Sequence, residues 1–111
     1  MGRKRNLLYT DKKGNTYIFS QIARYKGKGK YKYTASFVNA ENGRLKSVHF
    51  GHRDYSDYTI HKDKQRMERY LERHRKREDW TNLMSPGSLS RWILWSKPKF
   101  NDALNEYYKQ F

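Results

Sequence analysis

The sequence contains no cysteine, which excludes a disulfide framework and a metal site built from thiolates. No apolar run approaches the ~18 residues that a membrane-spanning helix needs, and the basic start of the chain lacks the apolar core of a secretory signal. Apolar residues make up only 35% of the chain, whereas aromatic residues reach 16% and include ten tyrosines. We therefore expect one modest core built from large amphipathic rings rather than from aliphatic side chains.

Acidic residues are also scarce. The chain carries 25 Lys and Arg against 11 Asp and Glu, a net charge of +14 over 111 residues. The excess is uneven, because residues 1–51 hold 12 basic and 2 acidic residues, whereas residues 52–111 hold 13 and 9. Such a charge indicates a polyanionic partner, which is nucleic acid, an anionic membrane surface or an acidic protein. We expect the first half to face this partner and the second half to be a scaffold whose charges pair with one another.

The length predicts a single domain, residues 7–111, preceded by a basic arm at residues 1–6. Residues 7–51 form the predicted β-meander, and residues 52–111 form the helical half. Turn signals separate the β-rich stretches of the meander, and Asn42-Gly43 is the strongest hairpin signal among them. The alternation of side chains in the second strand leaves open which of its faces points inward. The predicted strands are residues 7–10, 16–25, 31–39 and 44–50.

Amphipathic periodicity predicts three helices in the second half. Asp57 or Thr59 is the expected N-cap of the first, and Ser85 is the expected N-cap of the second, whose end is set by Pro98. The predicted helices are residues 61–78, 86–97 and 100–111. The expected fold is therefore α+β: an N-terminal antiparallel meander of three to four strands, followed by three C-terminal helices.

All three tryptophans lie in residues 80–97, a stretch too apolar to stand alone in water. Leu89, Trp92 and Ile93 recur at i, i+3 and i+4, which places them on one helix face. Trp95 falls outside this stripe, and we expect it to be exposed. Packing in the core and contact with a partner protein both fit this pattern. The residues predicted for core or protein interface are Trp80, Trp92, Trp95, Tyr107 and Phe111.

Basic residues concentrate in the arm, in a glycine-rich tip at residues 26–30 and along the first helix. The tip has Tyr25, Tyr31 and Tyr33 beside it, and this mixture of cations and stacking rings is typical of proteins that bind single strands. A solvated charged surface is the alternative interpretation. The residues predicted to bind polyanion are Arg3, Lys4, Arg5, Lys26, Lys28, Lys30, Lys32, Arg66, Arg69 and Arg73.

Catalytic and metal-binding patterns are weak. His49 and His52 have HxxH spacing near Asp54 and Asp57, but the other histidines do not complete the set of four ligands that a structural zinc site prefers. The chain has no GxSxG, P-loop or GxGxxG motif, and the basic tip lacks the strand–loop–helix context of a phosphate-binding loop. We therefore predict no enzymatic activity, no catalytic residue, no metal, no cofactor and no small-molecule substrate.

A string of short motifs runs from residue 48 to the C-terminus, a little over half of the chain. It consists of His49-Phe50-Gly51, Tyr55-Ser56-Asp57, His61-Lys62-Asp63, Arg73-His74-Arg75, Trp80, Leu89-Ser90-Arg91-Trp92, Leu94-Trp95, Lys97-Pro98, Tyr108-Lys109 and Phe111. This string resembles a family of small, basic, uncharacterised proteins encoded by large nucleocytoplasmic double-stranded DNA viruses, including viruses of algae and amoebae. The family has no established activity to transfer. The resemblance implies a viral source and a place in or near the virion.

Two functions follow from these observations. The first is a virion-associated minor structural protein of the capsid or inner shell, which bridges coat protein and a polyanion. The second is sequence-nonspecific nucleic-acid binding or genome packaging. The expected partners are capsid or other virion proteins, genomic DNA or RNA, and the anionic surface of an inner membrane. The expected location is the virion, with the host cytoplasm or viral factory during assembly.

Overall fold

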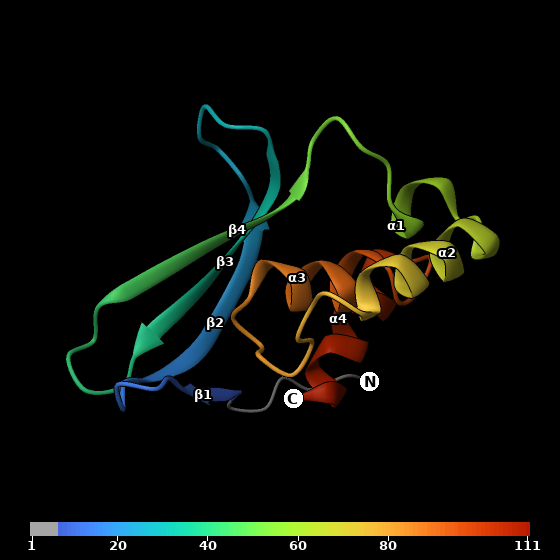
Figure 1. The fold of residues 1–111 in the computed structure, drawn as a ribbon. Helices are drawn as coiled ribbons and strands as arrows, with labels where there is room; N and C mark the ends of the chain where they lie inside the picture. Colours follow the sequence, from blue (N-terminus) through green and yellow to red (C-terminus); the bar gives the residue numbers. More distant parts are fainter. Residues whose placement is uncertain (1–6) are drawn as a thin grey trace.

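The computed structural model describes residues 7–111, so the predicted basic arm, residues 1–6, lies outside the described residues. Within residues 7–111, four strands form one antiparallel sheet in the order β1-β2-β3-β4, and the helices follow (Figure 1). The strands are β1 (Leu8–Thr10), β2 (Thr16–Arg24), β3 (Tyr31–Asn39) and β4 (Leu45–His52). This arrangement confirms the predicted α+β fold with an N-terminal meander.

A β-bulge in β2 decides which of its side chains face the core. Phe19 pairs with Phe37 and Ile22 pairs with Ala35, while the register shifts between Phe19 and Gln21. The extra residue places Phe19 and Ile22 on the same side of the sheet, although strict alternation would put them on opposite sides. Phe19, Ala35 and Phe37 are buried, and Ile22 packs against them. The inward face of this strand, which the alternation left open, is set by the bulge.

The helical half begins with two short elements instead of one long helix. The elements are α1 (Tyr58–His61), α2 (Lys64–Arg75), α3 (Pro86–Leu89), a single π-helical turn η1 (Ser90–Leu94) and α4 (Phe100–Gln110). The predicted helix over residues 61–78 is wrong at its start, because Lys62 adopts a left-handed conformation (φ 56°) between α1 and α2, and wrong at its end, since α2 stops at Arg75. Asp57 caps the short helix α1, whereas Asp63, and neither Asp57 nor Thr59 as predicted, caps α2, the main part of the predicted helix. Two capping aspartates six residues apart each start a helix, since their side chains satisfy free backbone N–H groups.

The predicted exposure of Trp95 is also wrong. The turn η1 has i→i+5 hydrogen bonding, which adds one residue relative to an α-helix and rotates later side chains by about 100°. Trp95 is half-buried, and its ring stacks on Tyr70 of α2, with centroids 4.0 Å apart and planes 2° from parallel. Leu89, Ile93 and Leu94 fill the core side of this segment. The α-helical spacing failed as a guide because the backbone is not α-helical at this point.

The core lies between the inner face of the sheet and the segment formed by α3, η1 and α4. Tyr107 of α4 is fully buried, and its ring meets Phe19 edge-on with centroids 5.6 Å apart. Tyr33 of β3 stacks on Phe50 of β4 and on Phe100 of α4, with centroids 5.8 and 5.1 Å away. Aromatic rings therefore join sheet and helices, as the composition predicted. No helix between residue 7 and the C-terminus is both long and apolar enough to span a membrane.

Candidate functional site

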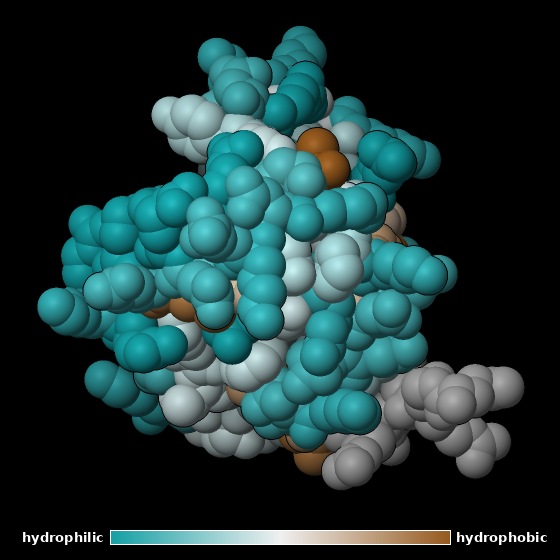
Figure 2. Space-filling view, turned by 90° about the vertical axis from the view of Figure 1, so that its right-hand side faces the viewer, coloured by the Kyte–Doolittle hydropathy of each residue, from teal (hydrophilic) through white to brown (hydrophobic). Residues whose placement is uncertain are grey.

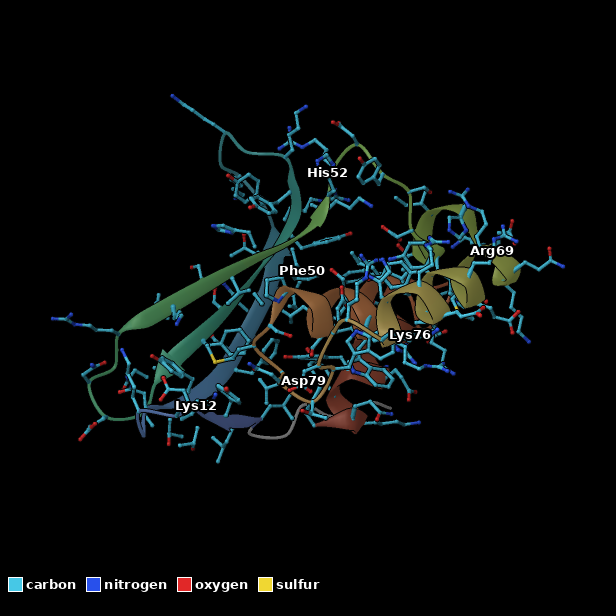
Figure 3. The ribbon with its side chains drawn as sticks, viewed as in Figure 1. Lys12, Phe50, His52, Arg69, Lys76 and Asp79 are labelled. Carbon is cyan, nitrogen blue, oxygen red and sulfur yellow. The ribbon has the colours of Figure 1, made fainter. Side chains whose placement is uncertain are left out.

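A groove of about 640 Å³ lies between the sheet and α2. One wall is the segment that leaves β4 and crosses to α1, residues 52–57, and the opposite wall is α2 with η1 behind it. In Figure 1 this segment arches from the end of β4 to α1. Figure 3 places His52 at the end of β4 and Arg69 on α2, the two elements that flank the groove. We call this feature the groove.

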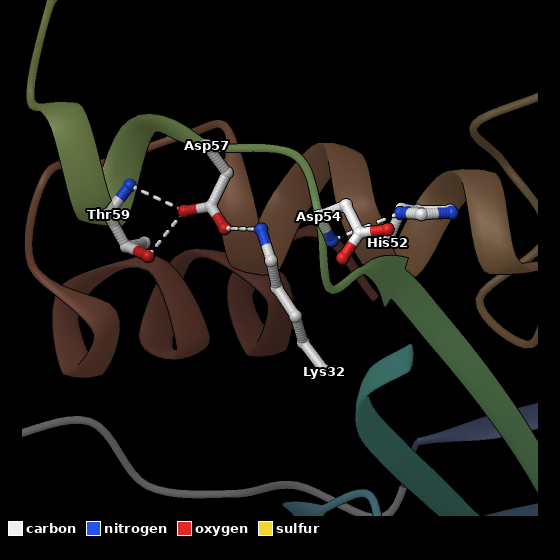
Figure 4. Close-up of polar contacts among 5 residues, drawn as sticks. All are labelled: Lys32, His52, Asp54, Asp57 and Thr59. Atoms are coloured by element: carbon white, nitrogen blue, oxygen red, sulfur yellow. Dashed lines mark hydrogen bonds and ion pairs between the residues drawn. The ribbon is translucent and has the colours of Figure 1, made fainter. Parts of the chain in front are cut away.

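A buried ion pair holds the two halves of the chain together at the base of the groove. The Nζ of Lys32, on β3, lies 2.6 Å from Oδ2 of Asp57, and both side chains are almost fully buried, at 13% and 2% exposure (Figure 4). The other carboxylate oxygen of Asp57 accepts hydrogen bonds from the backbone N–H and the hydroxyl of Thr59. Asp57 therefore ends the crossing segment, caps α1 and neutralises a lysine of the sheet.

The crossing segment is also tied to the basic tip. The backbone N–H of Arg53 donates to the carbonyl oxygen of Lys30 at 2.8 Å, and its guanidinium donates to the carbonyl oxygen of Gly29 at 3.0 Å. The Nζ of Lys30 lies 3.2 Å from a carboxylate oxygen of Asp54. The backbone N–H of Asp54 donates to Nδ1 of His52, as Figure 4 shows. These contacts place the tip, residues 26–30, directly beside the groove.

The wall formed by α2 carries two arginines with a tyrosine between them. Arg66, Tyr70 and Arg73 recur at i, i+4 and i+7, so they share one helix face, and all three line the groove. The ring of Tyr70 stacks between Trp95 and His74, with centroids 4.0 and 4.1 Å away. Burial raises the pKa of the Tyr70 hydroxyl, which therefore stays neutral. Both faces of Tyr70 are covered, so this ring is a rigid part of the wall.

The arginines of α2 have no acidic partner. Of the 22 lysines and arginines in residues 7–111, only Lys30 and Lys32 form ion pairs, and both pair with aspartates of the crossing segment. The predicted self-pairing of charges in the second half is therefore wrong. Two of its carboxylates bind other groups instead: Asp63 caps α2, and Glu78 contacts Nδ1 of His74 and accepts a hydrogen bond from the indole N–H of Trp80. Figure 2 shows the side that carries α1 and α2 in Figure 1, and hydrophilic residues cover most of this face, with a few small hydrophobic patches between them.

The tip is closed over a tyrosine. The hydroxyl of Tyr25 accepts a hydrogen bond from the backbone N–H of Gly29, and a Cβ at Gly27 would lie 2.3 Å from that hydroxyl oxygen. Tyr25 and Tyr31 pack against His49 on the sheet, with ring centroids 4.8 and 5.4 Å from the imidazole. A side chain at position 27 would therefore displace the Tyr25 ring from this position. Tyr33, predicted to belong with this cluster, packs in the core instead.

The predicted site residues do not all lie in one place. Lys32, Arg66, Arg73 and Trp95 line the groove, and Lys26, Lys28 and Lys30 lie on the tip beside it. Trp92, Tyr107 and Phe111 pack in or against the core, while Trp80 and Trp92 flank the guanidinium of Arg91 at 5.2 and 4.0 Å. Arg69 is exposed on α2 and does not line the groove, and Arg3, Lys4 and Arg5 lie outside the described residues.

Several groove residues escaped the sequence analysis as site residues. His52, Tyr55, Tyr70 and His74 all line the groove. The spacing of Tyr70 between Arg66 and Arg73 is a signal that the sequence does carry, because it puts a ring and two cations on one helix face. No local sequence pattern predicts that Tyr55 lies across the groove from α2, because this arrangement depends on how the crossing segment folds.

The histidines have structural partners. Nδ1 of His49 lies 2.9 Å from the hydroxyl of Thr34, and Nδ1 of His61 accepts from the backbone N–H of Asp63 at 2.8 Å. Burial lowers the pKa of His61, which favours its neutral form and the hydrogen bond to Asp63. Across the described range, no three histidine or carboxylate side chains gather closely enough to hold a metal ion.

Comparison with family models finds one similarity. Residues 23–74 match the model described as "Family of unknown function (DUF5754)". The match covers just under half of the chain and runs from the end of β2 to the last turn of α2. It therefore includes the tip, the crossing segment and the face of α2 that lines the groove. No curated protein and no solved structure matches the chain significantly.

Proposed function

We propose that this protein binds nucleic acid without reading its sequence, and that it has no enzymatic activity. The observation that supports this proposal is the set of unpaired cations on both sides of the groove. Lys26 and Lys28 lie on the tip, Arg66, Arg69 and Arg73 lie on α2, and none of them has an ion-pair partner in the part of the chain that the structure describes. Flexible cations around a concave surface suit the phosphate backbone, which presents regular negative charge and no sequence information.

Binding to DNA at two salt concentrations tests this function. A fluorescently labelled DNA of about 16 nucleotides, as a single strand and as a duplex, is titrated with the full chain at about 50 and 200 mM salt. We expect the affinity to fall steeply with salt for several unrelated sequences, since bound phosphates release counterions. The double variant Lys26→Ala/Lys28→Ala should make the plot of log affinity against log salt concentration less steep, by an amount equal to the loss of about one to two phosphate contacts. Absence of binding at the lower salt, or an affinity that salt does not change, would contradict the proposal.

A second candidate function is the minor structural role in a virion, and one feature of the sheet favours it. Leu8 pairs with Ile18, Ile18 with Val38, and Val38 with Leu45, so these four side chains form a row across the outer face of all four strands. Leu8 and Leu45 are 55% and 71% exposed. The tryptophans expected as anchors for a coat protein are all partly buried, and this row is an exposed apolar surface suited to such a contact.

Fractionation of particles tests the second candidate. If the viral source implied by the resemblance is right, the protein should be present in purified virions of that virus. When virions are opened in high salt, a structural protein should stay with the shell that has lost its DNA, and a Leu8→Ser/Leu45→Ser variant should be lost from it. Release together with the DNA would favour packaging alone, and absence from the virion would contradict both virion roles.

A further inference from the structure

One aromatic ring of the groove is free to accept another ring. Tyr55, in the crossing segment, is 70% exposed and lines the groove. One face of its ring is covered by His52, with centroids 4.6 Å apart and planes 32° from parallel. Tyr70, on the opposite wall, has both faces covered by Trp95 and His74. Of the two groove tyrosines, Tyr55 is therefore the one with a free face, and an imidazole supports its other face.

The charge inside the groove is set by two arginines. The two carboxylates in its lining, Asp54 and Asp57, are neutralised by Lys30 and Lys32 at 3.2 and 2.6 Å. Arg66 and Arg73 also line the groove, and within residues 7–111 their guanidinium groups have no hydrogen-bond or ion-pair partner. They are seven residues apart on one helix face, which separates them by about 10.5 Å along the axis. Guanidinium groups suit phosphate oxygens because they offer several N–H donors in one plane.

The size of the groove restricts what it holds. A volume of about 640 Å³ lies within the range of ~300–1,000 Å³ that is usual for pockets holding a small organic ligand. A DNA or RNA duplex is far too wide for it, and in a duplex the base faces are stacked on their neighbours. An unpaired nucleotide offers a free base face together with a phosphate, and the groove presents one free ring and two free guanidinium groups.

We propose that the groove binds an unpaired nucleotide of a nucleic-acid single strand, with the base stacked on Tyr55 and the adjoining phosphates held by Arg66 and Arg73. This inference rests on the proposed nucleic-acid binding and narrows its substrate class to single strands. Stacking on an aromatic ring is tolerant of sequence, because every base has a π-face. The tip lysines beside the groove then contact the continuing backbone by charge alone.

The test compares a single strand with a duplex of the same length, about 16 nucleotides, by fluorescence anisotropy. Tyr55→Ala should weaken single-strand binding about tenfold and leave duplex binding unchanged. Tyr55→Phe should retain the affinity, since it retains the ring. Arg66→Ala/Arg73→Ala should weaken single-strand binding more than Arg75→Ala/Arg77→Ala, a control that removes the same charge from exposed positions outside the groove lining.

Each outcome has a separate meaning. The groove is not a single-strand site if Tyr55→Ala weakens the affinity for the single strand and for the duplex equally. The same conclusion follows if the two double arginine variants lose single-strand affinity equally. Neither result would contradict salt-dependent binding of nucleic acid. Absence of any binding by the unaltered protein would instead refute the proposed function. A titration with thymidine monophosphate separates a strand from a free nucleotide, because a monophosphate that binds as tightly as the strand would also overturn the inference. Tyr55 lies on an exposed segment, so its variants are expected to fold normally.

Discussion

Asp57→Asn is expected to lower the free energy of unfolding by about 3–5 kcal/mol, the usual cost of removing one partner of a buried ion pair. The change keeps an oxygen that can accept from Thr59, so the cap of α1 survives. It removes the negative charge that lies 2.6 Å from Nζ of Lys32, a lysine whose side chain is only 13% exposed. A loss of this size is a large part of the total stability of a small domain, which is about 5–15 kcal/mol.

Urea unfolding followed by tryptophan fluorescence measures this effect. Lys32→Met should be similarly destabilising, because it leaves the Asp57 carboxylate buried without a counter-charge. The double variant Lys32→Met/Asp57→Asn should be more stable than either single variant, since no unpaired charge remains buried. The exposed pair Lys30–Asp54, at 69% and 54% exposure, is the matched control, and breaking it should cost no more than about 1 kcal/mol. Equal losses for the two pairs would show that the buried Lys32–Asp57 pair stabilises the domain no more than an exposed pair does.

Tyr107→Ala is expected to destabilise the domain by about 3–5 kcal/mol through loss of a fully buried ring. The ring of Tyr107 contacts Phe19 of the sheet and Phe111 at the end of the chain, with centroids 5.6 and 5.3 Å away. Its hydroxyl donates to the carbonyl oxygen of Leu83 at 2.8 Å, which anchors the segment before α3. One side chain thus connects the sheet, α4 and the connection between α2 and α3.

Tyr107→Phe separates the ring from the hydroxyl. It should cost about 1–3 kcal/mol, because the buried carbonyl of Leu83 loses its donor while the aromatic packing is kept. The two variants are compared by urea unfolding with Tyr55→Ala as the control, since truncation of an exposed tyrosine should change the stability by less than about 0.5 kcal/mol. A loss in Tyr107→Ala no larger than that in the control would contradict the central place of α4 in the core.

The sequence by itself determined the local elements and the overall charge. Alternating and β-branched stretches separated by strong turn signals predicted the meander, and the Asn42-Gly43 turn connects β3 and β4, with Gly43 at φ 74°. The amphipathic pattern at the C-terminus predicted α4, whose last helical residue is Gln110. Capping by Ser85 was likewise predicted, while Asp57, one of two caps expected for the helix over residues 61–78, caps the short helix α1 instead. These features depend on neighbours a few residues apart, so the sequence alone contains the information that specifies them.

Tertiary structure decided which residues meet. The bulge in β2 and the π-helical turn η1 each add one residue to a regular period, and this changes the facing of Ile22 and Trp95 without any local sequence signal. The ion pair between Lys32 and Asp57 joins residues 25 positions apart, and the groove exists only because the crossing segment returns past α2. Composition determined that this protein is basic and aromatic. Only long-range packing brought one free ring and two unpaired guanidinium groups into the same groove, because such contacts depend on the path of the whole chain.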